Sequence, residues 1–347
     1  MLPPSPLFVS AGRWLLESGI QESSGGVARY HLLRESRNLP VSTEITGYAA
    51  SALAHLYRRT GGSAYLEAAV RAAQFLTREA WNEELGTFPF ELAPGSPCYF
   101  FDCGIIVRGL LAVWRITRDQ EPLDVAFACG RNMGRDFLSA EAIHPVISLP
   151  DRAPLAYEKR WSREPGCFLL KAALAWNDLA EITGDPSFTA WWERAIDLAV
   201  DNDSVFLPGS DDRLRVMDRL HAYLYYLEAL LATGRGDLLG PGIERVAGLL
   251  REIAPDFARS DVYAQLLRVR LLAASVGLVE LDRVAVGEEA LSIPGFQYQD
   301  GGFSFGRRAG VLMPFANPVS TAFCAQAWDW WNEFQAGRFD GRLDQLV

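Results

Sequence analysis

The feature that most constrains the fold of this chain is a threonine-centred turn that recurs between helix-like segments. The four turns read RRTGGS, RITRDQ, EITGDP and LATGRG, and each follows one helix-periodic run and precedes another. Before the first turn, apolar residues recur at the i, i+3, i+4 and i+7 spacing of an amphipathic helix. Glycine or a polar residue stands where a helix end favours positive φ. Such self-similarity predicts an array of helical hairpins. The turn threonines are Thr60, Thr117, Thr183 and Thr233.

Two weaker copies bring the predicted number of helix pairs to six. One runs from Asp261 through AASVGL and the other from Ser320 through QAG. Connections inside a pair are a few residues long, as antiparallel neighbours require, whereas those between pairs are long. Alternating β-type runs are scarce. We therefore predict an all-α (α/α)6 toroid, in which six inner helices form a barrel and six outer helices wrap it. The prediction is one domain over residues 1–347, with hairpins from about 25 to 334.

A four-residue word, PVST, occurs near both ends of the chain. It occupies residues 40–43 and 318–321, and a glycine pair lies upstream each time, at Gly25-Gly26 and Gly301-Gly302. Proline suits the first turn of a helix, and serine or threonine suits its N-cap. The word therefore predicts that the first and last hairpins start in the same way and become neighbours when the ring closes.

Composition excludes several classes of protein. Of the 347 residues, 49% are apolar and 22% charged, which favours a large core over disorder. Apolar stretches such as GIIVRGLLAVW are interrupted well before the roughly 20 residues of a membrane span. The net charge of −10 argues against bulk nucleic-acid binding. The five cysteines show no zinc-type spacing, and no secretory signal is evident, so we expect a cytoplasmic protein without metal or cofactor.

Acidic residues lie near the starts of most predicted inner helices. Glu44 lies 16 residues before its turn threonine, and Asp102 and Asp218 each lie 15 before theirs. An acid here can simply cap a helix or face its macrodipole. A closed ring would, however, bring these carboxylates to one mouth, and glycoside hydrolysis needs two carboxyl groups about 5–9 Å apart. We predict Glu44 and Asp102 as that pair, because the aromatic neighbours of Asp102 in CYFFDCG would raise its pKa.

His221 is the second candidate. In DRLHAYLYY, Asp218 and His221 stand at i, i+3 on one helical face, where an aspartate could orient an imidazole as a general base. The alternative is a histidine that is satisfied within the core.

The long connections carry aromatic residues and cations. Flat apolar rings beside polar groups suit sugars, and cations in a protein of net negative charge suggest an anionic sugar such as a uronate. The alternatives are rings that anchor loops and arginines that pair with nearby acids. The substrate-binding candidates are Tyr48, Tyr99, Tyr157, Trp161, Arg163, Arg219, Tyr298 and Asp300.

The segments STEITGYAASALAHLYRRTGG, FDCGIIVRGLLAVWRITRD and HAYLYYLEALLATG resemble the six-hairpin glycosidase superfamily, particularly uncharacterised bacterial members associated with polysaccharides. The resemblance extends from about Gly25 to Phe334. It implies an active site at the mouth of the inner helices, which falls by position on Glu44, Tyr48, Asp102, Asp218 and His221. Relatives include glycoside hydrolases, polysaccharide lyases and uronyl epimerases, and no catalytic signature is matched residue by residue.

A second resemblance lies in QYQDGGFSF, residues 297–305, which is similar to a repeat of terpene cyclase and protein prenyltransferase toroids. The DxDD motif of those enzymes is absent, and SDDRLR lacks the further acid of a diphosphate site. Isoprenoid chemistry and a non-catalytic glycan-binding or scaffold role are the alternatives to the main prediction.

That prediction is a protein that binds an oligosaccharide or polysaccharide in a central cavity and cleaves or modifies a glycosidic linkage without a cofactor. In a hydrolase, Asp102 would be the general acid and Glu44 the nucleophile or base. In a lyase or epimerase, His221 or Tyr48 would abstract the C5 proton and Arg219 would neutralise the uronate.

Overall fold

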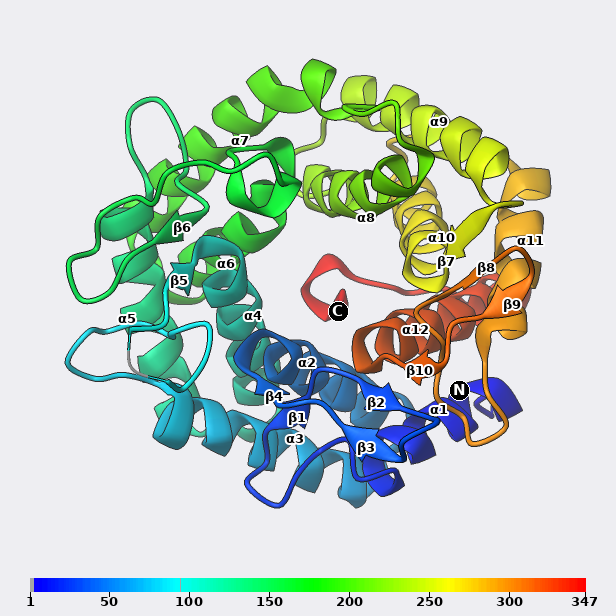
Figure 1. Ribbon diagram of the computed structural model, residues 1–347, viewed down its shortest axis with the longest axis horizontal. Helices are drawn as coiled ribbons and strands as arrows, with labels where there is room; N and C mark the ends of the chain where they lie inside the picture. Colours follow the sequence, from blue (N-terminus) through cyan, green and yellow to red (C-terminus); the bar gives the residue numbers. More distant parts are fainter. Residues whose placement is uncertain (1–2, 94) are drawn as a thin grey trace.

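The computed structural model describes residues 3–93 and 95–347, and its twelve α-helices form two concentric rings (Figure 1). The predicted (α/α)6 toroid is therefore confirmed. Most residues of the inner helices are buried, as expected of helices that pack against neighbours on both sides, and the buried charged side chains among them are paired or lie at the helix ends. The inner ring consists of α2 (Thr43–Thr60), α4 (Phe100–Thr117), α6 (Leu170–Thr183), α8 (Arg213–Leu230), α10 (Ser260–Ser275) and α12 (Pro318–Gln335). The outer ring consists of α1 (Pro6–Glu17), α3 (Ser63–Phe75), α5 (Gln120–Phe137), α7 (Pro186–Phe206), α9 (Gly236–Ile253) and α11 (Arg283–Ser292).

The recurring turn threonine has the same local role in all four copies. Its hydroxyl donates to a carbonyl in the last turn of the inner helix and accepts from the backbone N–H two residues further on, at 3.2 Å each time. The residue between them has positive φ, as in Gly61 at 72° and Arg118 at 59°. This bonding satisfies the free groups of the helix end and fixes a tight reversal of the chain.

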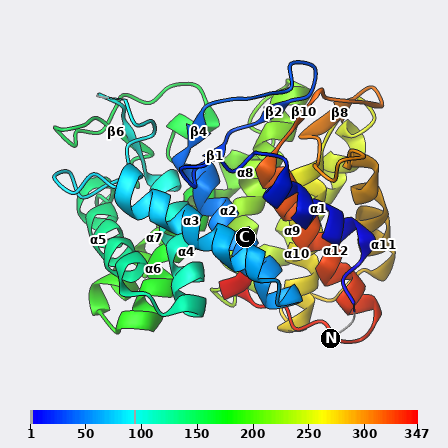
Figure 2. The same cartoon turned by 90° about the horizontal axis from the view of Figure 1, so that it is seen from below.

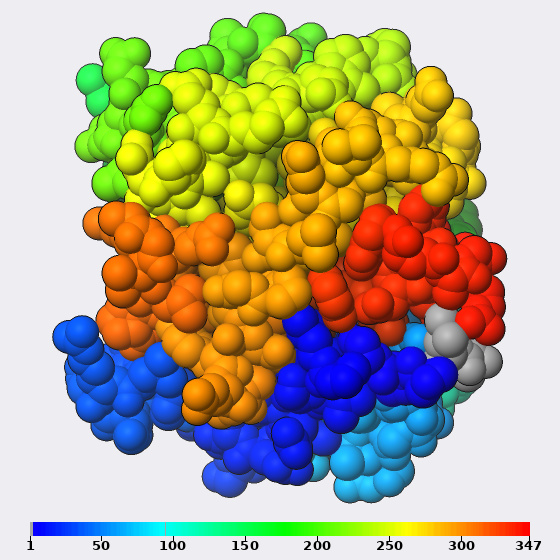
Figure 3. Space-filling view, turned by 90° about the vertical axis from the view of Figure 1, so that its right-hand side faces the viewer, coloured from blue at the N-terminus to red at the C-terminus, as the bar shows by residue number. Residues whose placement is uncertain are grey.

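The ring closes differently from the prediction. The sixth outer helix is α1, which precedes the predicted range of 25–334 and packs against α12 and α3. Figure 3 shows these first residues, in dark blue, against the orange and red segments of the chain's last part. Within the described residues, α12 is not followed by an outer α-helix, because the N-terminal helix α1 occupies that position in the ring.

The two PVST words are not structurally equivalent, which corrects that part of the prediction. Ser42 caps α2, whereas Asn317 caps α12 and Pro318 is already inside the helix. The structural repeat aligns the two N-caps, Ser42 and Asn317, and so differs by three residues from the alignment of the two PVST words. Thr46 and Thr321 are equivalent, since each accepts a backbone N–H at 2.9 Å, from Val27 and Phe303 respectively.

The glycine pairs noted upstream belong to this repeat. The Gln21 and Gln297 amides each donate to the carbonyl of the first glycine of their pair, and each also donates to a carbonyl of an outer helix. At Gly25 (φ 96°) and Gly301 (φ 103°), a Cβ would lie 2.3 and 2.2 Å from a backbone oxygen of that helix. Only glycine permits both the conformation and this approach. The QYQDGG segment is therefore half of an internal structural repeat.

Short strands lie in the long connections, and Figure 2 shows β2, β6, β8 and β10 along one edge of the molecule. They form antiparallel ladders in the orders β1-β4, β10-β2-β3, β5-β6 and β7-β8-β9. We call this end, where the inner helices begin, the barrel mouth. The strands are β1 (Val27–Ala28), β2 (His31–Leu32), β3 (Arg37–Asn38), β4 (Val41–Ser42), β5 (Cys98–Tyr99), β6 (Val146–Ile147), β7 (Phe257–Arg259), β8 (Gly306–Arg308), β9 (Val311–Leu312) and β10 (Phe315–Ala316).

The other end of the barrel is filled by the segment after α12. Leu346 and Val347 are buried in the centre of the ring, where Figure 1 shows the C-terminus. Arg108 donates to the Leu346 carbonyl, and Gln326 accepts the Val347 N–H. The barrel is thus closed at this end. None of the helices in the described ranges has the length and apolar character needed to cross a membrane.

Candidate active site

Three acidic residues lie in the first turns of inner helices at the barrel mouth. Glu44 is the second residue of α2, Asp102 the third of α4 and Asp261 the second of α10. The N-terminal position favours the ionised form of each carboxylate through the helix dipole. Their different surroundings therefore decide which of them keep a proton.

Glu44 and Asp102 are brought together by the close packing of α2 on α4. A Cβ on Gly47 would lie 2.9 Å from Ile106 Cα, and one on Gly109 would lie 2.4 Å from the Gly47 carbonyl oxygen. With no side chain at these crossing points, the two backbones touch and their N-terminal turns lie next to each other. The pairing of these two acids in catalysis stays a prediction.

Both carboxyl groups hold their protons unusually strongly. Glu44 is only partly exposed, and burial raises its pKa to about 7 although the charge of Arg29 opposes the shift. Burial, followed by the charge of Glu44, raises the pKa of Asp102 well above its ordinary range. Asp102 Oδ2 is buried and has no hydrogen-bond partner among the described residues. Burial therefore favours the protonated form of both carboxyls, and Glu44 titrates near neutral pH.

His221 also lies at the mouth, but the predicted contact with Asp218 is wrong. His221 Nδ1 is 2.7 Å from Gln265 Oε1 and 3.5 Å from Asp261 Oδ2. Asp218 instead accepts a hydrogen bond from Arg259 at 2.9 Å. Because both partners of Nδ1 are acceptors, Nδ1 carries the proton and Nε2 is the basic nitrogen.

Burial lowers the pKa of His221 to about 4, so the imidazole is neutral at physiological pH. Its ring packs edge-on against Tyr225, with centroids 4.5 Å apart. A neutral, oriented imidazole can accept a proton at Nε2, but its pKa of about 4 makes it a weak base at neutral pH.

Arg259, which the sequence analysis missed, organises the α10 side of the mouth. It binds Asp261 through two hydrogen bonds of 2.9 and 2.6 Å, and its guanidinium lies 4.2 Å from the centroid of the Phe305 ring. Although burial opposes the effect, the Arg259 charge keeps the pKa of Asp261 below its ordinary value. The charge of Arg259 thus favours the ionised form of Asp261, whereas burial favours the protonated form of Asp102. Asp261 is the residue at which one of the weaker copies was predicted to start, but nothing in the sequence marked Arg259.

Aromatic side chains form the layer beneath the acids. The Tyr225 ring packs against Phe101 at 4.8 Å, and Tyr48 packs against Phe323 at 5.4 Å. Burial, the Tyr225 hydroxyl and the Glu44 charge together raise the pKa of the predicted residue Tyr48 well above its ordinary value. Tyr48 is therefore a hydrogen-bonding group at neutral pH.

Tyr30, also missed, lies near charged residues of the mouth. Burial raises its pKa, and the charges of Arg259, Glu44, Asp261 and Arg29 all reach it. Its ring packs on Phe315, at a centroid distance of 5.1 Å. The loop that carries it reaches the mouth through the pairing of β2 with β10, a contact between opposite ends of the chain.

Three predicted binding residues lie at the rim near Asp102. The Arg163 guanidinium lies over the Tyr99 ring at 5.7 Å and also binds Glu158 at 2.6 Å. Trp161 packs edge-on against Phe168, which in turn packs against Phe101. These residues extend the aromatic surface outward from the acids.

The remaining four predicted binding residues have contacts elsewhere. Arg219 donates to the Phe206 carbonyl and stacks on the Phe206 ring at 4.3 Å, which holds it at the α7–α8 connection. Tyr157 is 49% exposed and bonds His144. The Tyr298 hydroxyl donates to the Met313 carbonyl, and Asp300 accepts the Gly302 N–H at 3.0 Å. Tyr298 and Asp300 thus serve the loop of the internal repeat.

The described residues contain no cluster of three or more histidine, cysteine and acidic side chains that could hold a metal ion. All five cysteines are free and buried. With QYQDGG accounted for by the internal repeat, the sequence features that suggested prenyltransferase chemistry have a structural role.

Comparisons with known proteins support the fold. No protein-family model matches the chain, and no curated protein matches it by sequence. Among solved structures, the cellobiose 2-epimerase of Spirochaeta thermophila matches with a TM-score of 0.69 at 14% identity, over 93% of this chain and 95% of that one. An α-1,6-mannanase, GH76A, of Salegentibacter sp. matches with a TM-score of 0.60 at 12% identity, over 93% and 97%.

A third structure, described as UGL with dGlcA-Glc-Rha-Glc, has a TM-score of 0.64 at 14% identity and covers 97% of this chain and 99% of that one. At identities of 12–14%, these structures show the fold of this chain, and they confirm the predicted (α/α)6 toroid.

Proposed function

We propose that this chain is a carbohydrate-active enzyme that binds an oligosaccharide at the barrel mouth and cleaves a glycosidic linkage. The observation that carries the proposal is the Glu44–Asp102 pair. These two carboxyl groups lie on adjacent inner helices, and the protein holds both pKa values above their ordinary range. In this reading no cofactor takes part, because the two carboxyls supply the acid and the base.

We assign different roles to the two carboxyl groups. Burial and the charge of Glu44 favour the protonated form of Asp102, which acts as general acid on the leaving oxygen. Glu44, with a pKa of about 7, is the group that ionises, and it acts as base or nucleophile. The two roles depend on each other, because the charge on Glu44 is one cause of the raised pKa of Asp102.

The residues around the acids suit a sugar chain. Tyr30, Tyr99 and Phe305 offer aromatic surfaces for the CH faces of sugar rings, and Arg259 and Arg29 offer cations. The Arg29 guanidinium lies over the Phe90 ring, 5.1 Å from its centroid. We assign to Arg29 the binding of a uronate carboxylate, the role that the sequence analysis gave to Arg219. A structural neighbour, the inactive α-1,6-mannanase variant, was determined with mannotriose, which supports a glycan as the ligand class.

A second candidate reaction is abstraction of a carbon-bound proton by His221, as in an epimerase. It is favoured by the neutral imidazole, whose Nδ1 is held by Gln265 and Asp261 so that Nε2 is basic. This reaction would leave the glycosidic bond intact and exchange a sugar C–H with solvent. The neighbours that are epimerases make it a specific alternative.

One experiment separates these functions. The protein is incubated in D₂O with α-1,6-mannooligosaccharides, cellobiose and uronate-containing oligosaccharides, and the products are followed by NMR and mass spectrometry. Hydrolysis gives shorter chains with new reducing ends, and epimerisation gives deuterium at carbon with unchanged chain length. An unsaturated product that absorbs in the ultraviolet would indicate a lyase.

Variants test the residue roles in the same assay. Asp102→Asn should abolish cleavage, while His221→Asn should reduce it less. If His221→Asn reduces turnover more than Asp102→Asn does, and deuterium enters the sugar, the protein is an epimerase. Binding without any turnover would indicate a glycan-binding protein and overturn the proposal.

A further inference from the structure

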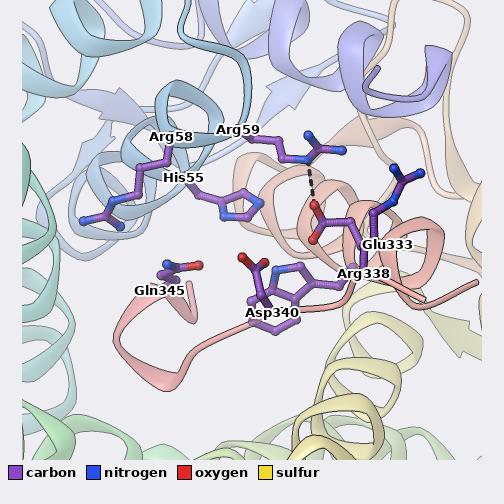
Figure 4. A pocket seen from close by; sticks show the side chains of 8 residues that line it. His55, Arg58, Arg59, Glu333, Arg338, Asp340 and Gln345 are labelled. Carbon is purple, nitrogen blue, oxygen red and sulfur yellow. Dashed lines mark ion pairs between the residues drawn. The ribbon is translucent and has the colours of Figure 1, made fainter. Parts of the chain in front are cut away.

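Two of the four histidines lie on inner helices, and they differ in the access that a ligand has to Nε2. His55 lies at the closed end of the barrel, where it lines a cavity of about 290 Å³ (Figure 4), and its Nε2 is buried without a hydrogen-bond partner among the described residues. His221 lies at the mouth. Its Nε2 also has no partner within residues 3–93 and 95–347, but this atom is not buried, and the side chain is 10% exposed. Of the two, His221 alone presents a free ring nitrogen to a ligand.

The other ring nitrogen of His221 is held by α10. Asp261 and Gln265 stand at i, i+4 on that helix and so share one face, which meets His221. Nδ1 is 2.7 Å from Gln265 Oε1 and 3.5 Å from Asp261 Oδ2. If the Gln265 amide were turned round, its NH₂ group would require a lone pair on Nδ1, and that lone pair would also face the Asp261 carboxylate. The carboxylate therefore fixes both the orientation of the amide and Nδ1–H as the donor.

Gln265 gives the imidazole an acceptor that carries no charge. Gln265 is fully buried, and a carboxylate in its place would favour the imidazolium ion. Burial, the largest effect, and the charge of Arg259 lower the pKa of His221 to about 4. The charges of Asp261 and Glu228 and the hydrogen bond to Gln265 act in the opposite direction. At neutral pH Nε2 thus carries a lone pair and can only accept a hydrogen bond.

The imidazole adjoins the groups that carry the proposed reaction. Its ring packs on Tyr225, with centroids 4.5 Å apart, and the charges of Glu44 and Asp261 both reach Tyr225. The Tyr225 ring also packs on Phe101, the residue before Asp102 in α4. The free Nε2 therefore belongs to the same mouth as the two acids.

We propose that Gln265 is a positioning residue that holds His221 as a hydrogen-bond acceptor, through which the mouth selects a sugar with a free hydroxyl group at Nε2. This inference rests on the proposed function, because it takes the ligand to be a sugar. A hydroxyl can donate to Nε2, whereas a carboxylate or an esterified or methylated hydroxyl cannot. A site that is built to bond a hydroxyl rejects a ligand that leaves its own polar group unpaired. The uronate carboxylate assigned to Arg29 must then lie away from His221.

The test follows the ring nitrogens of His221 by NMR in the whole protein, labelled with ¹⁵N-histidine. His221→Asn identifies its signals among those of the four histidines. In the free protein at neutral pH we expect a protonated Nδ1 and an unprotonated Nε2. Titration with α-1,6-mannotriose, cellotriose or a glucuronate-containing trisaccharide should move the Nε2 resonance towards that of a hydrogen-bonded nitrogen. The resonances of His55, which no ligand reaches, should stay in place.

Gln265→Glu tests the positioning role, because it keeps the shape of the side chain and adds a charge. It should raise the pKa of His221 by about 1–3, so that Nε2 carries a proton in mildly acidic solution. Sugar affinity there should fall about tenfold below that of wild type at the same pH, and the difference should narrow in alkaline solution. Gln120→Glu adds the same charge at an exposed position of α5 and should behave as wild type. A merely structural role for Gln265 would lower the melting temperature and leave the pKa of His221 unchanged.

Three results overturn the inference and leave the proposed function, which depends on Glu44 and Asp102, in place. They are a proton on Nε2 in the free protein at neutral pH, a sugar that binds without moving the Nε2 resonance, and an unchanged pKa of His221 in Gln265→Glu. If none of the three saccharides binds, the inference and the proposed function both fail. Should Gln265→Glu not fold, the resonances of the wild-type protein decide the question.

Discussion

The barrel mouth and the barrel centre both bury carboxylates, but they treat them in opposite ways. Glu228 in the centre is fully buried and bonds Lys171 at 2.8 Å and Arg268 at 2.5 Å. Asp102 at the mouth is almost as buried, yet one of its oxygens has no partner and its pKa is raised. A buried acid that is paired with cations contributes to the structure, whereas burial without a partner favours the protonated form of an acid, which can donate a proton. Burial alone therefore does not identify a catalytic acid.

The largest effect should come from removing the donated proton. We expect Asp102→Asn to lower turnover of a cleaved oligosaccharide by about 10²–10⁴-fold, the usual contribution of general acid catalysis. Glycan affinity and melting temperature should change little, because asparagine keeps the shape and places no charge in the site. Steady-state kinetics and a binding titration measure both quantities. Undiminished turnover would mean that Asp102 is not the acid.

Replacing the paired acid, Glu228, should lower the stability of the fold. We expect Glu228→Ala to lower the free energy of unfolding by about 3–5 kcal/mol, because it leaves two buried cations without their shared carboxylate. Burial already lowers the pKa of Lys171 to about 7, so Lys171 can respond by losing its proton. Urea unfolding measures the change. Glu121→Ala, which breaks an exposed pair with Arg78, is the control and should leave stability nearly unchanged.

The pH dependence of stability should separate Glu44 from His221. With its pKa raised to about 7, Glu44 stabilises the fold below about pH 4.5, and this stabilisation is lost as pH rises to about 7, because the unfolded chain ionises first. His221, with its pKa lowered to about 4, has the opposite effect: its stabilisation is present above about pH 6.5 and is lost as pH falls to about 4.

Glu44→Gln should therefore remove the decline between about pH 4.5 and 7, a difference on the order of 1–3 kcal/mol at pH 8. His221→Asn should instead remove the decline on the acidic side. Melting temperatures between pH 4 and pH 8 test both. Parallel curves for Glu44→Gln and wild type would show that Glu44 titrates normally.

The smallest effect concerns the helix contact that pairs the acids. A Cβ at Gly47 would meet the backbone of α4, so we expect Gly47→Ala to cost about 1–3 kcal/mol and to reduce activity by separating Glu44 from Asp102. Gly248 in α9 has open space around it, and Gly248→Ala should stabilise by about 0.5–1 kcal/mol through helix propensity. Denaturant unfolding and kinetics on both variants test the contact. If both behave alike, the close approach of α2 and α4 does not matter.

Much of the fold could be predicted from local patterns. The turn threonines, the helical periodicity and the long connections determined the six-hairpin toroid, since each depends on residues within about twenty positions of one another. The series of acids at helix starts located the mouth and named Glu44 and Asp102. The identical PVST words misled, because a shared word does not fix the helix register, and Asn317 caps where serine was expected.

What only the tertiary structure decided are the contacts between distant residues. Helical spacing places Asp218 and His221 on one face, but it does not say that Arg259 takes the aspartate or that Gln265 and Asp261 take the histidine. It also does not show that α1 closes the ring or that Tyr30 arrives on a β-ladder from the other end of the chain. The sequence determines which groups each helix presents, whereas the packing of one helix on another determines their partners, and the partners set the pKa values on which any chemistry here depends.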